Sequence, residues 1–217
     1  MRMRRKGNLE TRAANCPSLY EVGDDALDSR VEEERYIDLS KWKNAVLEVG
    51  CGKGKFALEY SKSHNETAYV AVEKMTNVII EGAEKAADEG VENLLFLRTG
   101  AEYLKRYFKE GTFDKVFLNF PCPYKKESYR DRRLTAPSFL EIYDALLVDG
   151  GEICLKTDNK RMFEYSLESF SSYGLLITDV TLDLHSSKYV EGNVMTEYES
   201  KFFSMGVPIL RVVAKKR

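Results

Sequence analysis

The stretch LEVGCGKG, residues 47–54, joins a short apolar run to three glycines spaced two residues apart. Ala45–Val49 predicts a buried strand, and Phe56–Ser61 directly after the glycines has a helical pattern. A glycine turn between a strand and a helix lets backbone amides approach a ligand at the helix N-terminus. The same turn also occurs where a strand only packs closely against a helix, so the loop by itself leaves both roles open.

Short apolar runs and helical patterns alternate on both sides of this loop. The further expected strands are Thr67–Val72, Asn93–Leu97, Lys115–Phe120 and Glu152–Lys156, with two late strands at Leu175–Leu184 and Ile209–Ala214. The further expected helices are Val78–Ala87, Glu102–Phe108, Phe139–Leu147 and Phe163–Phe170. This alternation predicts an α/β fold with a mostly parallel, Rossmann-like sheet, helices on both faces, and ligands bound beyond the carboxyl ends of the strands.

The first forty residues differ from the rest of the chain. They are polar, are interrupted by Gly7, Pro17 and Gly23, and show no sustained period. We therefore expect residues 1–40 to form a partly flexible N-terminal arm with at most a short helix. Residues 41–217 then form a single domain.

Charge and cysteine content restrict the function classes. Lys and Arg number 33 against 35 Asp and Glu, so the net charge of −2 gives no global attraction to nucleic acid, and any polyanion site must be local. Basic runs occur at Arg2–Lys6, Lys125–Arg133 and Lys215–Arg217, and solvated surface is the ordinary interpretation of each run alone. Four widely separated cysteines and the lack of a long apolar run predict a cytoplasmic protein without a disulfide framework, a bound metal or a membrane contact.

Two acidic residues accompany the glycine loop. Glu73 ends the second expected strand, 23 residues after Gly50, where a carboxylate can accept hydrogen bonds from ribose hydroxyls. A dinucleotide fingerprint would place its third glycine at Lys55, and the G-x-G-x-G spacing found here is the one used for S-adenosylmethionine. Glu48 precedes the loop and could hold the ammonium group of that cofactor, although it could also be an exposed residue of a half-buried strand.

More specific strings lie in the second half of the chain. They are NFPCPYKKESYRDRRLT from Asn119, LKTDNKRMFEYSLESF from Leu155, and TEYESKFFSMGVPILR from Thr196. Together with MRMRRK at the start and LEVGCGKG, the sequence resembles the bacterial tRNA (guanine-N7)-methyltransferase family over almost its whole length. The resemblance implies a class I S-adenosylmethionine-dependent fold with an antiparallel late strand, and methyl transfer to N7 of guanine 46 in the tRNA variable loop by a monomer or homodimer.

The resemblance also implies roles for individual residues. The expected cofactor-binding residues are Glu48, Gly50, Gly52, Gly54, Glu73, Gly100, Ala101, Asn119 and Cys122. The expected substrate-binding residues are Lys126, Asp158, Thr196, Glu197, Tyr198 and Glu199, because carboxylates can accept hydrogen bonds from guanine N1 and N2. The expected RNA contacts are Ser128, Tyr129, Arg130, Asp131, Arg132 and Arg133, from a loop suited to phosphate binding.

Structural interpretations of these motifs remain open. The basic loop could be solvated surface, and Asp158 with Asn159 could cap a helix that begins near Lys160. The segment around Thr196 could be an ordinary loop, and the polar approach through residues 186–193 suggests a segment that becomes ordered only with substrate.

The sequence departs from the family pattern at two positions near the cofactor. The family pattern N-F-x-D-P-W has an aspartate at its centre, in the catalytic site, whereas this chain has Cys122 there, which is neutral at pH 7 unless its pKa is lowered. Gly100 replaces an acidic or amide residue that relatives use to hold the adenine amino group. We therefore expect weaker cofactor binding or slower turnover, with three possible functions: an active enzyme, a catalytically weakened tRNA-binding homologue, or a small-molecule methyltransferase.

Overall fold

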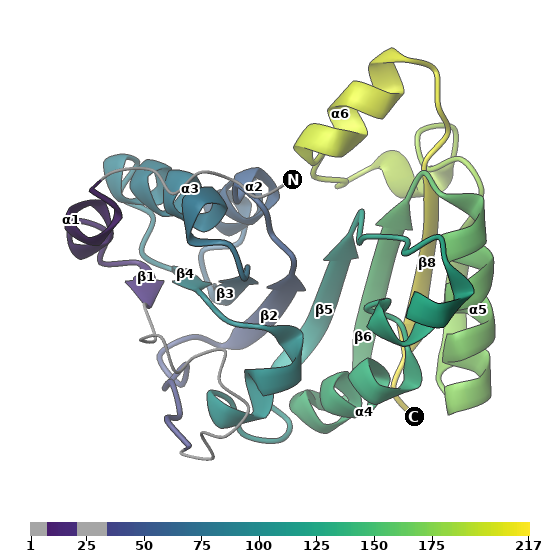
Figure 1. Cartoon of the computed structure of the whole chain (residues 1–217), viewed down its shortest axis with the longest axis horizontal. Helices are drawn as coiled ribbons and strands as arrows, with labels where there is room; N and C mark the ends of the chain where they lie inside the picture. Colours follow the sequence, from purple (N-terminus) through teal and green to yellow (C-terminus); the bar gives the residue numbers. More distant parts are fainter. Residues whose placement is uncertain (1–7, 21–33) are drawn as a thin grey trace.

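The structure is a computed structural model that describes residues 8–20 and 34–217. An eight-stranded sheet with the order β1-β4-β3-β2-β5-β6-β8-β7 runs through the molecule (Figure 1). Only β8 runs against its neighbours β6 and β7, so the expected antiparallel late strand is confirmed. The strands are β1 (Leu19–Tyr20), β2 (Asn44–Val49), β3 (Thr67–Val72), β4 (Leu94–Leu97), β5 (Phe113–Asn119), β6 (Leu147–Thr157), β7 (Leu176–Thr181) and β8 (Leu210–Lys215).

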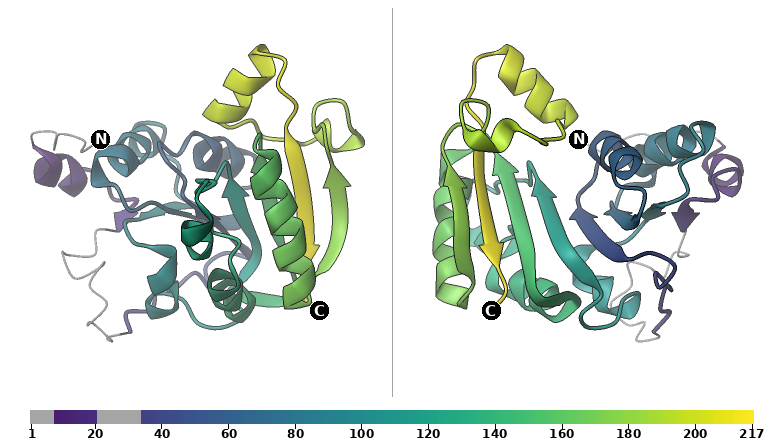
Figure 2. Two further views of the ribbon diagram at one scale, coloured as in Figure 1. Left: turned by 45° about the vertical axis from the view of Figure 1, so that its right-hand side comes forward. Right: turned by 180° about the vertical axis from the view of Figure 1, so that it is seen from behind.

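Helices cover both faces of the sheet, as the alternating pattern predicts (Figure 2). One face carries α1 (Leu9–Ala14), α2 (Lys55–Ser63) and α3 (Thr76–Asp88), and the other carries the 3-10 helix η2 (Ala101–Arg106) with α4 (Pro137–Leu146) and α5 (Lys160–Tyr173). Three further helices follow the carboxyl ends of strands or lead into β8: η3 (Glu127–Arg132), η4 (Lys188–Val190) and α6 (Glu197–Ser204).

Strand β2 explains why the sheet needs two helical layers. Val46 packs in the cluster with Phe56 of α2, whereas Leu47 and Val49 pack in the cluster with Leu140 of α4. A parallel strand that is buried on both faces is apolar in nearly every position instead of alternating with polar residues. The single charged side chain among residues 45–49 is Glu48, which is therefore buried as well.

The described part of the expected arm packs on the domain. Helix α1 lies against α3 with an Arg12–Glu84 ion pair, and Leu19 of β1 pairs with Phe96 of β4 at the edge of the sheet. The short helix was anticipated, but the edge strand was not, because two residues carry no recognisable strand pattern. The basic run Arg2–Lys6 lies outside the described residues.

Two local expectations differ from the structure. The helix expected at residues 102–108 is the 3-10 helix η2, which begins one residue earlier, at Ala101, and ends two residues earlier, at Arg106. The segment considered as a loop around Thr196 forms α6, because the Thr196 hydroxyl accepts a hydrogen bond from the Glu199 amide and the Glu199 carboxylate accepts one from the Thr196 amide. This capping box satisfies amides that an isolated helix end would leave unpaired.

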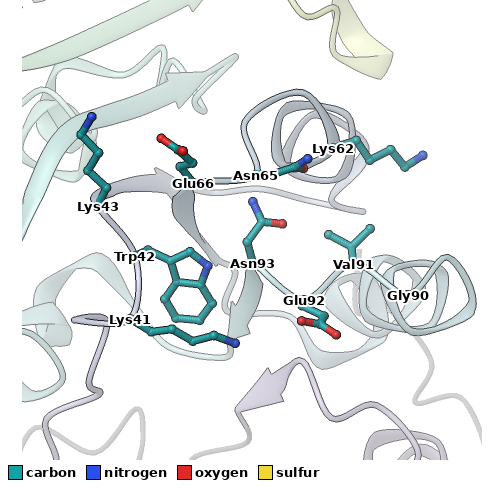
Figure 3. A pocket seen from close by; sticks show the side chains of 10 residues that line it. All are labelled: Lys41, Trp42, Lys43, Lys62, Asn65, Glu66, Gly90, Val91, Glu92 and Asn93. Atoms are coloured by element: carbon teal, nitrogen blue, oxygen red, sulfur yellow. The ribbon is translucent and has the colours of Figure 1, made fainter.

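A pocket of about 760 Å³ lies among the loops that precede β2, β3 and β4 (Figure 3). Its lining includes Trp42, Asn65 and Glu92. Because the strands are parallel, these loops lie at the edge opposite to the glycine loop, and the pocket belongs to a different end of the molecule. Within residues 8–20 and 34–217, no helix has both the length and the apolar character needed to cross a bilayer.

Candidate active site

The glycine loop connects β2 to α2 in a conformation that requires glycine. Gly50, Gly52 and Gly54 have φ of 81°, 58° and 71°, in the left-handed region. A Cβ on Gly54 would come within 2.5 Å of the Phe96 ring, so this glycine also allows α2 to approach the sheet closely. Gly54 thus has the packing role that the sequence left open, and the ligand-binding role of the loop stays a prediction.

Glu48 and Asn119 meet below the loop. The Asn119 amide donates to Glu48 Oε1 at 2.8 Å, and the Tyr69 hydroxyl donates to Glu48 Oε2 at 3.1 Å. Burial raises the pKa of Glu48 to about 7, even though both hydrogen bonds favour its charged form. Among the described residues, the buried Oδ1 of Asn119 has no hydrogen-bond partner. A carboxylate and an orphaned amide oxygen at one point fit a ligand that carries an ammonium group.

Glu73 lies at the end of β3 and contacts the glycine loop. Its Oε2 accepts a hydrogen bond from the Gly52 amide at 3.3 Å, and its Oε1 accepts from the amides of Lys74 and Met75. The structure therefore brings the loop and the acidic residue together, as a nucleoside site requires.

Gly100 and Ala101 follow β4 and begin η2. The space beside Gly100 is filled, because a Cβ at this position would come within 2.4 Å of Glu102 Oε2. Glu102 is in turn held by Lys74, whose ammonium group lies 2.8 Å from Glu102 Oε1. The carboxylate of Glu102 thus occupies the position that a side chain on residue 100 would take. Sequence reasoning did not single out Glu102.

Cys122 lies in the loop after β5 and is an exposed free thiol. The preceding residues Phe120 and Pro121 connect it directly to the end of β5. A small cavity lies beside the glycine loop, and the residues that line it do not include Cys122, Glu73, Gly100 or Ala101.

Helix α6 approaches the glycine loop from the opposite side. A cavity of about 90 Å³ is lined by Glu48, Gly50, Gly52 and Asn119 together with Thr196, Glu197 and Tyr198. Residues expected to bind cofactor and residues expected to bind substrate therefore share one cavity, although they are more than seventy positions apart in the sequence. This convergence at the carboxyl edge of the sheet defines the candidate active site.

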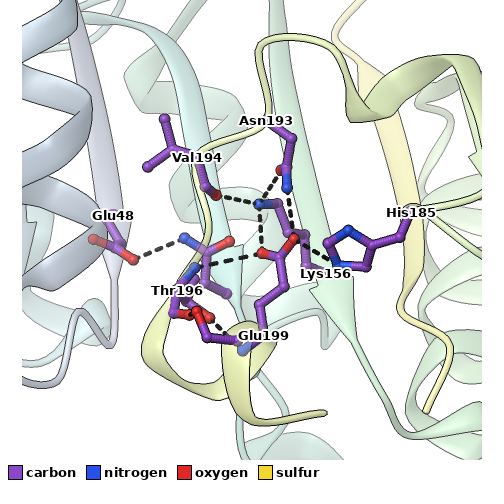
Figure 4. A network of polar contacts seen from close by, with 9 residues as sticks. Glu48, Lys156, His185, Asn193, Val194, Thr196 and Glu199 are labelled. Atoms are coloured by element: carbon purple, nitrogen blue, oxygen red, sulfur yellow. Dashed lines mark hydrogen bonds and ion pairs between the residues drawn. The ribbon is translucent and has the colours of Figure 1, made fainter. Parts of the chain in front are cut away.

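Unlike Thr196, Glu197 and Tyr198, Glu199 does not line this cavity. It lies in a network of polar contacts with Lys156 and Asn193 (Figure 4). It is fully buried, with Oε2 3.0 Å from the Lys156 ammonium group. Its Oε1 accepts a hydrogen bond from the Asn193 amide at 2.6 Å, and His185 Nε2 lies 3.3 Å away. Lys156 also donates to Asn193 Oδ1 at 2.6 Å and to the Val194 carbonyl at 2.9 Å. The expectation that the Glu199 carboxylate accepts hydrogen bonds from guanine does not match this geometry, because both of its oxygens are buried and contact other residues of the protein. We call Lys156, His185, Asn193 and Glu199 together the α6 anchor.

The expected RNA loop is exposed in all but one position. Lys126 caps η3, and Ser128, Tyr129, Arg130, Asp131 and Arg132 are exposed within it. Arg133 is instead buried: it donates to the carbonyls of Pro123 and Tyr124, and its guanidinium lies 4.3 Å from the centre of the Tyr165 ring. The expected RNA contact of Arg133 is therefore corrected to an internal role, which is to hold the loop against α5.

Asp158 lies at the end of β6 and is half-buried. The cap of α5 is its neighbour, because Asn159 Oδ1 accepts a hydrogen bond from the Met162 amide at 2.9 Å. The Asp158 carboxylate is left outside the cap and remains a candidate for substrate binding.

Several site residues escaped sequence reasoning. Lys156 stood within the quoted string LKTDN, and the spacing T-x-x-E at residues 196–199 is a recognisable capping-box signal. Asn193 stood in the polar approach through residues 186–193, but no local signal showed that it or His185 contacts Glu199, because that role depends on contacts across the fold. Across residues 8–20 and 34–217, no group of three or more His, Cys, Asp or Glu is arranged to hold a metal ion.

The mostly parallel eight-stranded sheet with helices on both faces is the fold of class I S-adenosylmethionine-dependent methyltransferases. The structure is similar to the 16S rRNA methyltransferase KamB, with 17% identity over 88% of this chain and 98% of that chain and a TM-score of 0.64. It is also similar to the aminoglycoside resistance methyltransferase NpmB1, with 17% identity, 82% and 89% coverage and a TM-score of 0.57. A 16S rRNA (adenine(1408)-N(1))-methyltransferase from Catenulisporales acidiphilia with cosubstrate SAM matches at 16% identity, 82% and 86% coverage and a TM-score of 0.58.

The family is shown by the sequence itself. Residues 43–212 match the family described as "Putative methyltransferase", and the chain belongs to this family, the tRNA (guanine-N7)-methyltransferase group that its motifs resemble.

Proposed function

We propose that the protein transfers a methyl group from S-adenosylmethionine to N7 of guanine 46 in the variable loop of tRNA. The observation that carries the proposal is the shared cavity in which Glu48, Gly50 and Asn119 face the start of α6. A methyl donor bound at the glycine loop would lie directly beside a base held by α6, as group transfer requires.

The cofactor would be held by residues at or just after the carboxyl ends of four neighbouring strands. Glu48 and the free Oδ1 of Asn119 suit its ammonium group, and Glu73 suits its ribose. Glu102, beside Gly100, suits the adenine amino group. When bound, S-adenosylmethionine supplies an electrophilic methyl group on a sulfonium centre.

The chemistry demands little proton transfer from the protein. Guanine N7 has an in-plane lone pair, so no proton must leave before it attacks. The protein has to align the base with the methyl group and to tolerate positive charge as it passes to the purine. Glu197 and Asp158, at the start of α6 and the end of β6, are the carboxylates available near the base, and they can also accept hydrogen bonds from guanine N1 and N2.

The basic loop supports an RNA substrate over a small molecule. Lys125, Lys126, Arg130 and Arg132 are exposed on the loop that follows β5, next to the candidate active site. Such a patch positions a phosphate backbone without reading its sequence. A base that is stacked in folded tRNA must be exposed or flipped to reach the cavity, at a cost of a few kcal/mol.

The test is methyl transfer from labelled S-adenosylmethionine to an unmodified tRNA transcript, with the product mapped by cleavage at N7-methylguanine. Label at the variable-loop guanine is expected. A transcript in which this guanine is replaced by adenine is the matched control and should accept no label. Label at another base, or in small molecules only, would contradict the proposal.

A catalytically weakened tRNA-binding protein is the second candidate. The observation in its favour is Cys122, a thiol where the family pattern has an aspartate. This protein would bind tRNA with strong salt dependence but incorporate no label in the same assay.

A further inference from the structure

Three aromatic rings gather where α6 meets the end of β5. The Phe120 ring centre lies 6.1 Å from that of Tyr198 and 5.9 Å from that of Phe202, with interplanar angles of 26° and 22°. We call these three residues the aromatic platform. Phe120 and Tyr198 also line the cavity shared with the glycine loop.

The platform is not simply an interior contact. Tyr198 is 61% exposed, although large aromatic side chains are usually buried when their only role is packing. Phe120 has a φ of 51°, which is unfavourable for a bulky residue, and its amide is fixed by a hydrogen bond to the Lys156 carbonyl. Strain of this kind is retained where the surrounding structure holds a side chain in a functional position.

The surroundings specify the chemistry of the ligand. The basic loop begins five residues after Phe120, so a flat apolar surface adjoins a cluster of positive charge. Aromatic rings beside basic side chains are the arrangement on which single-stranded nucleic acids stack their bases.

We infer that Phe120, Tyr198 and Phe202 form a stacking platform that holds the target purine of an RNA substrate over the cofactor cavity. This inference rests on the proposed function and extends it to residues that position the base. Glu197 and Asp158 would then accept hydrogen bonds from the edge of the purine, while the aromatic rings stack on its face. The α6 anchor, through Lys156 and Glu199, fixes the helix that carries two of the three rings.

The first test replaces the ring and keeps its apolar bulk. Tyr198→Leu should raise the KM for tRNA by at least about fivefold, since stacking on one aromatic side chain contributes that much or more. Tyr198→Phe should recover most of the affinity that Tyr198→Leu loses, because the ring is retained. Phe203→Leu is the matched control, since Phe203 is exposed on the same helix and its ring contacts His185 instead of the platform. Thermal unfolding of each variant reports whether packing has changed.

The second test does not depend on catalysis. Removing the target base from the transcript should weaken binding to the wild type, and it should have a smaller effect on Tyr198→Leu because the stacking surface is already lost. Equal KM values for Tyr198→Leu, Tyr198→Phe and the wild type, in an enzyme that does methylate the transcript, would overturn the inference and leave the proposed function intact. A wild-type protein that neither methylates nor binds the transcript would overturn both.

Discussion

At the scale of single residues, the proposed role of Glu48 in cofactor binding would link the stability of the protein to its ligand. The Glu48 pKa of about 7 in the folded protein lies above the ordinary value, so the neutral form is favoured by the fold. The protonated Glu48 carboxyl therefore contributes fully to the free energy of unfolding below its ordinary pKa of 4.5, and this contribution is lost as the pH rises through about 7. Binding a cation beside it reverses this cost, because the charged carboxylate then has a partner.

Glu48→Gln should accordingly raise the free energy of unfolding above pH 7, by up to about 3 kcal/mol, and change it little near pH 4. The same variant should lose cofactor affinity, because an uncharged amide cannot balance an ammonium group. Denaturant unfolding at pH 4, 6 and 8, with calorimetric titration of S-adenosylmethionine, measures both effects. If Glu48→Gln lowered the free energy of unfolding at pH 8, the charged Glu48 carboxylate would already be stabilised by the protein without a bound ligand.

Cys122 is the position at which this chain most directly departs from its family. It is exposed, so an aspartate placed there would ionise without a desolvation cost. Cys122→Asp should raise kcat/KM on the order of tenfold, equivalent to about 1.4 kcal/mol of transition-state stabilisation. Cys122→Ser, which stays neutral, should leave the rate unchanged. Steady-state methylation of the tRNA transcript distinguishes the two variants.

Gly100→Asp provides the contrasting control. Its new side chain would meet the carboxylate of Glu102 at 2.4 Å, and two like charges would compete for Lys74. We expect no gain from this replacement alone, in contrast to the simpler expectation from sequence that an acid at position 100 improves cofactor binding. A gain in cofactor affinity from Gly100→Asp would show that Glu102 does not already fill this role.

At the scale of one element, helix α6 depends on a local capping motif and on a contact with a strand that is far away in the sequence. The capping box between Thr196 and Glu199 begins the helix, and the buried contact of Glu199 with Lys156 fastens it to β6. A helix of this length is marginal in isolation, so its position depends on these contacts.

Lys156→Met or Glu199→Gln should each destabilise the protein by about 3–5 kcal/mol, because each leaves a buried charge without its partner. The double variant should be much more stable than the sum of the two losses predicts. Denaturant unfolding gives the free energies, and hydrogen exchange in α6 locates the effect. Additive losses would show that the two residues act independently.

At the scale of the whole molecule, the proposed binding of RNA would have to overcome a net charge of −2. The basic loop must then supply most of the attraction, and the affinity for tRNA should fall steeply as salt concentration rises. Lys126→Ala or Arg132→Ala should each lower the slope of log affinity against log salt by about 1. Lys43→Ala, at the opposite edge of the sheet, should leave the slope unchanged. Equal slopes for all three variants would place the RNA elsewhere.

The sequence by itself determined the alternation of strands and helices and the two helical layers, whereas the antiparallel late strand was expected from the family resemblance. Local apolar patterns specify these elements, and the connection rules of parallel sheets then restrict their arrangement. The convergence of Glu48, Gly50 and Glu73 was predictable for the same reason, since they lie at or just after the carboxyl ends of the neighbouring strands β2 and β3.

Tertiary structure alone decided which charged residues face solvent. Arg133 and Glu199 stand in motifs rich in exposed polar residues, yet one holds a loop against α5 and the other joins Lys156 and His185 in the α6 anchor. Glu102 likewise fills the space at Gly100, where it pairs with Lys74 from the loop between β3 and α3. These roles depend on contacts between residues far apart in the chain, and a local pattern carries no information on which distant partner a charge will find.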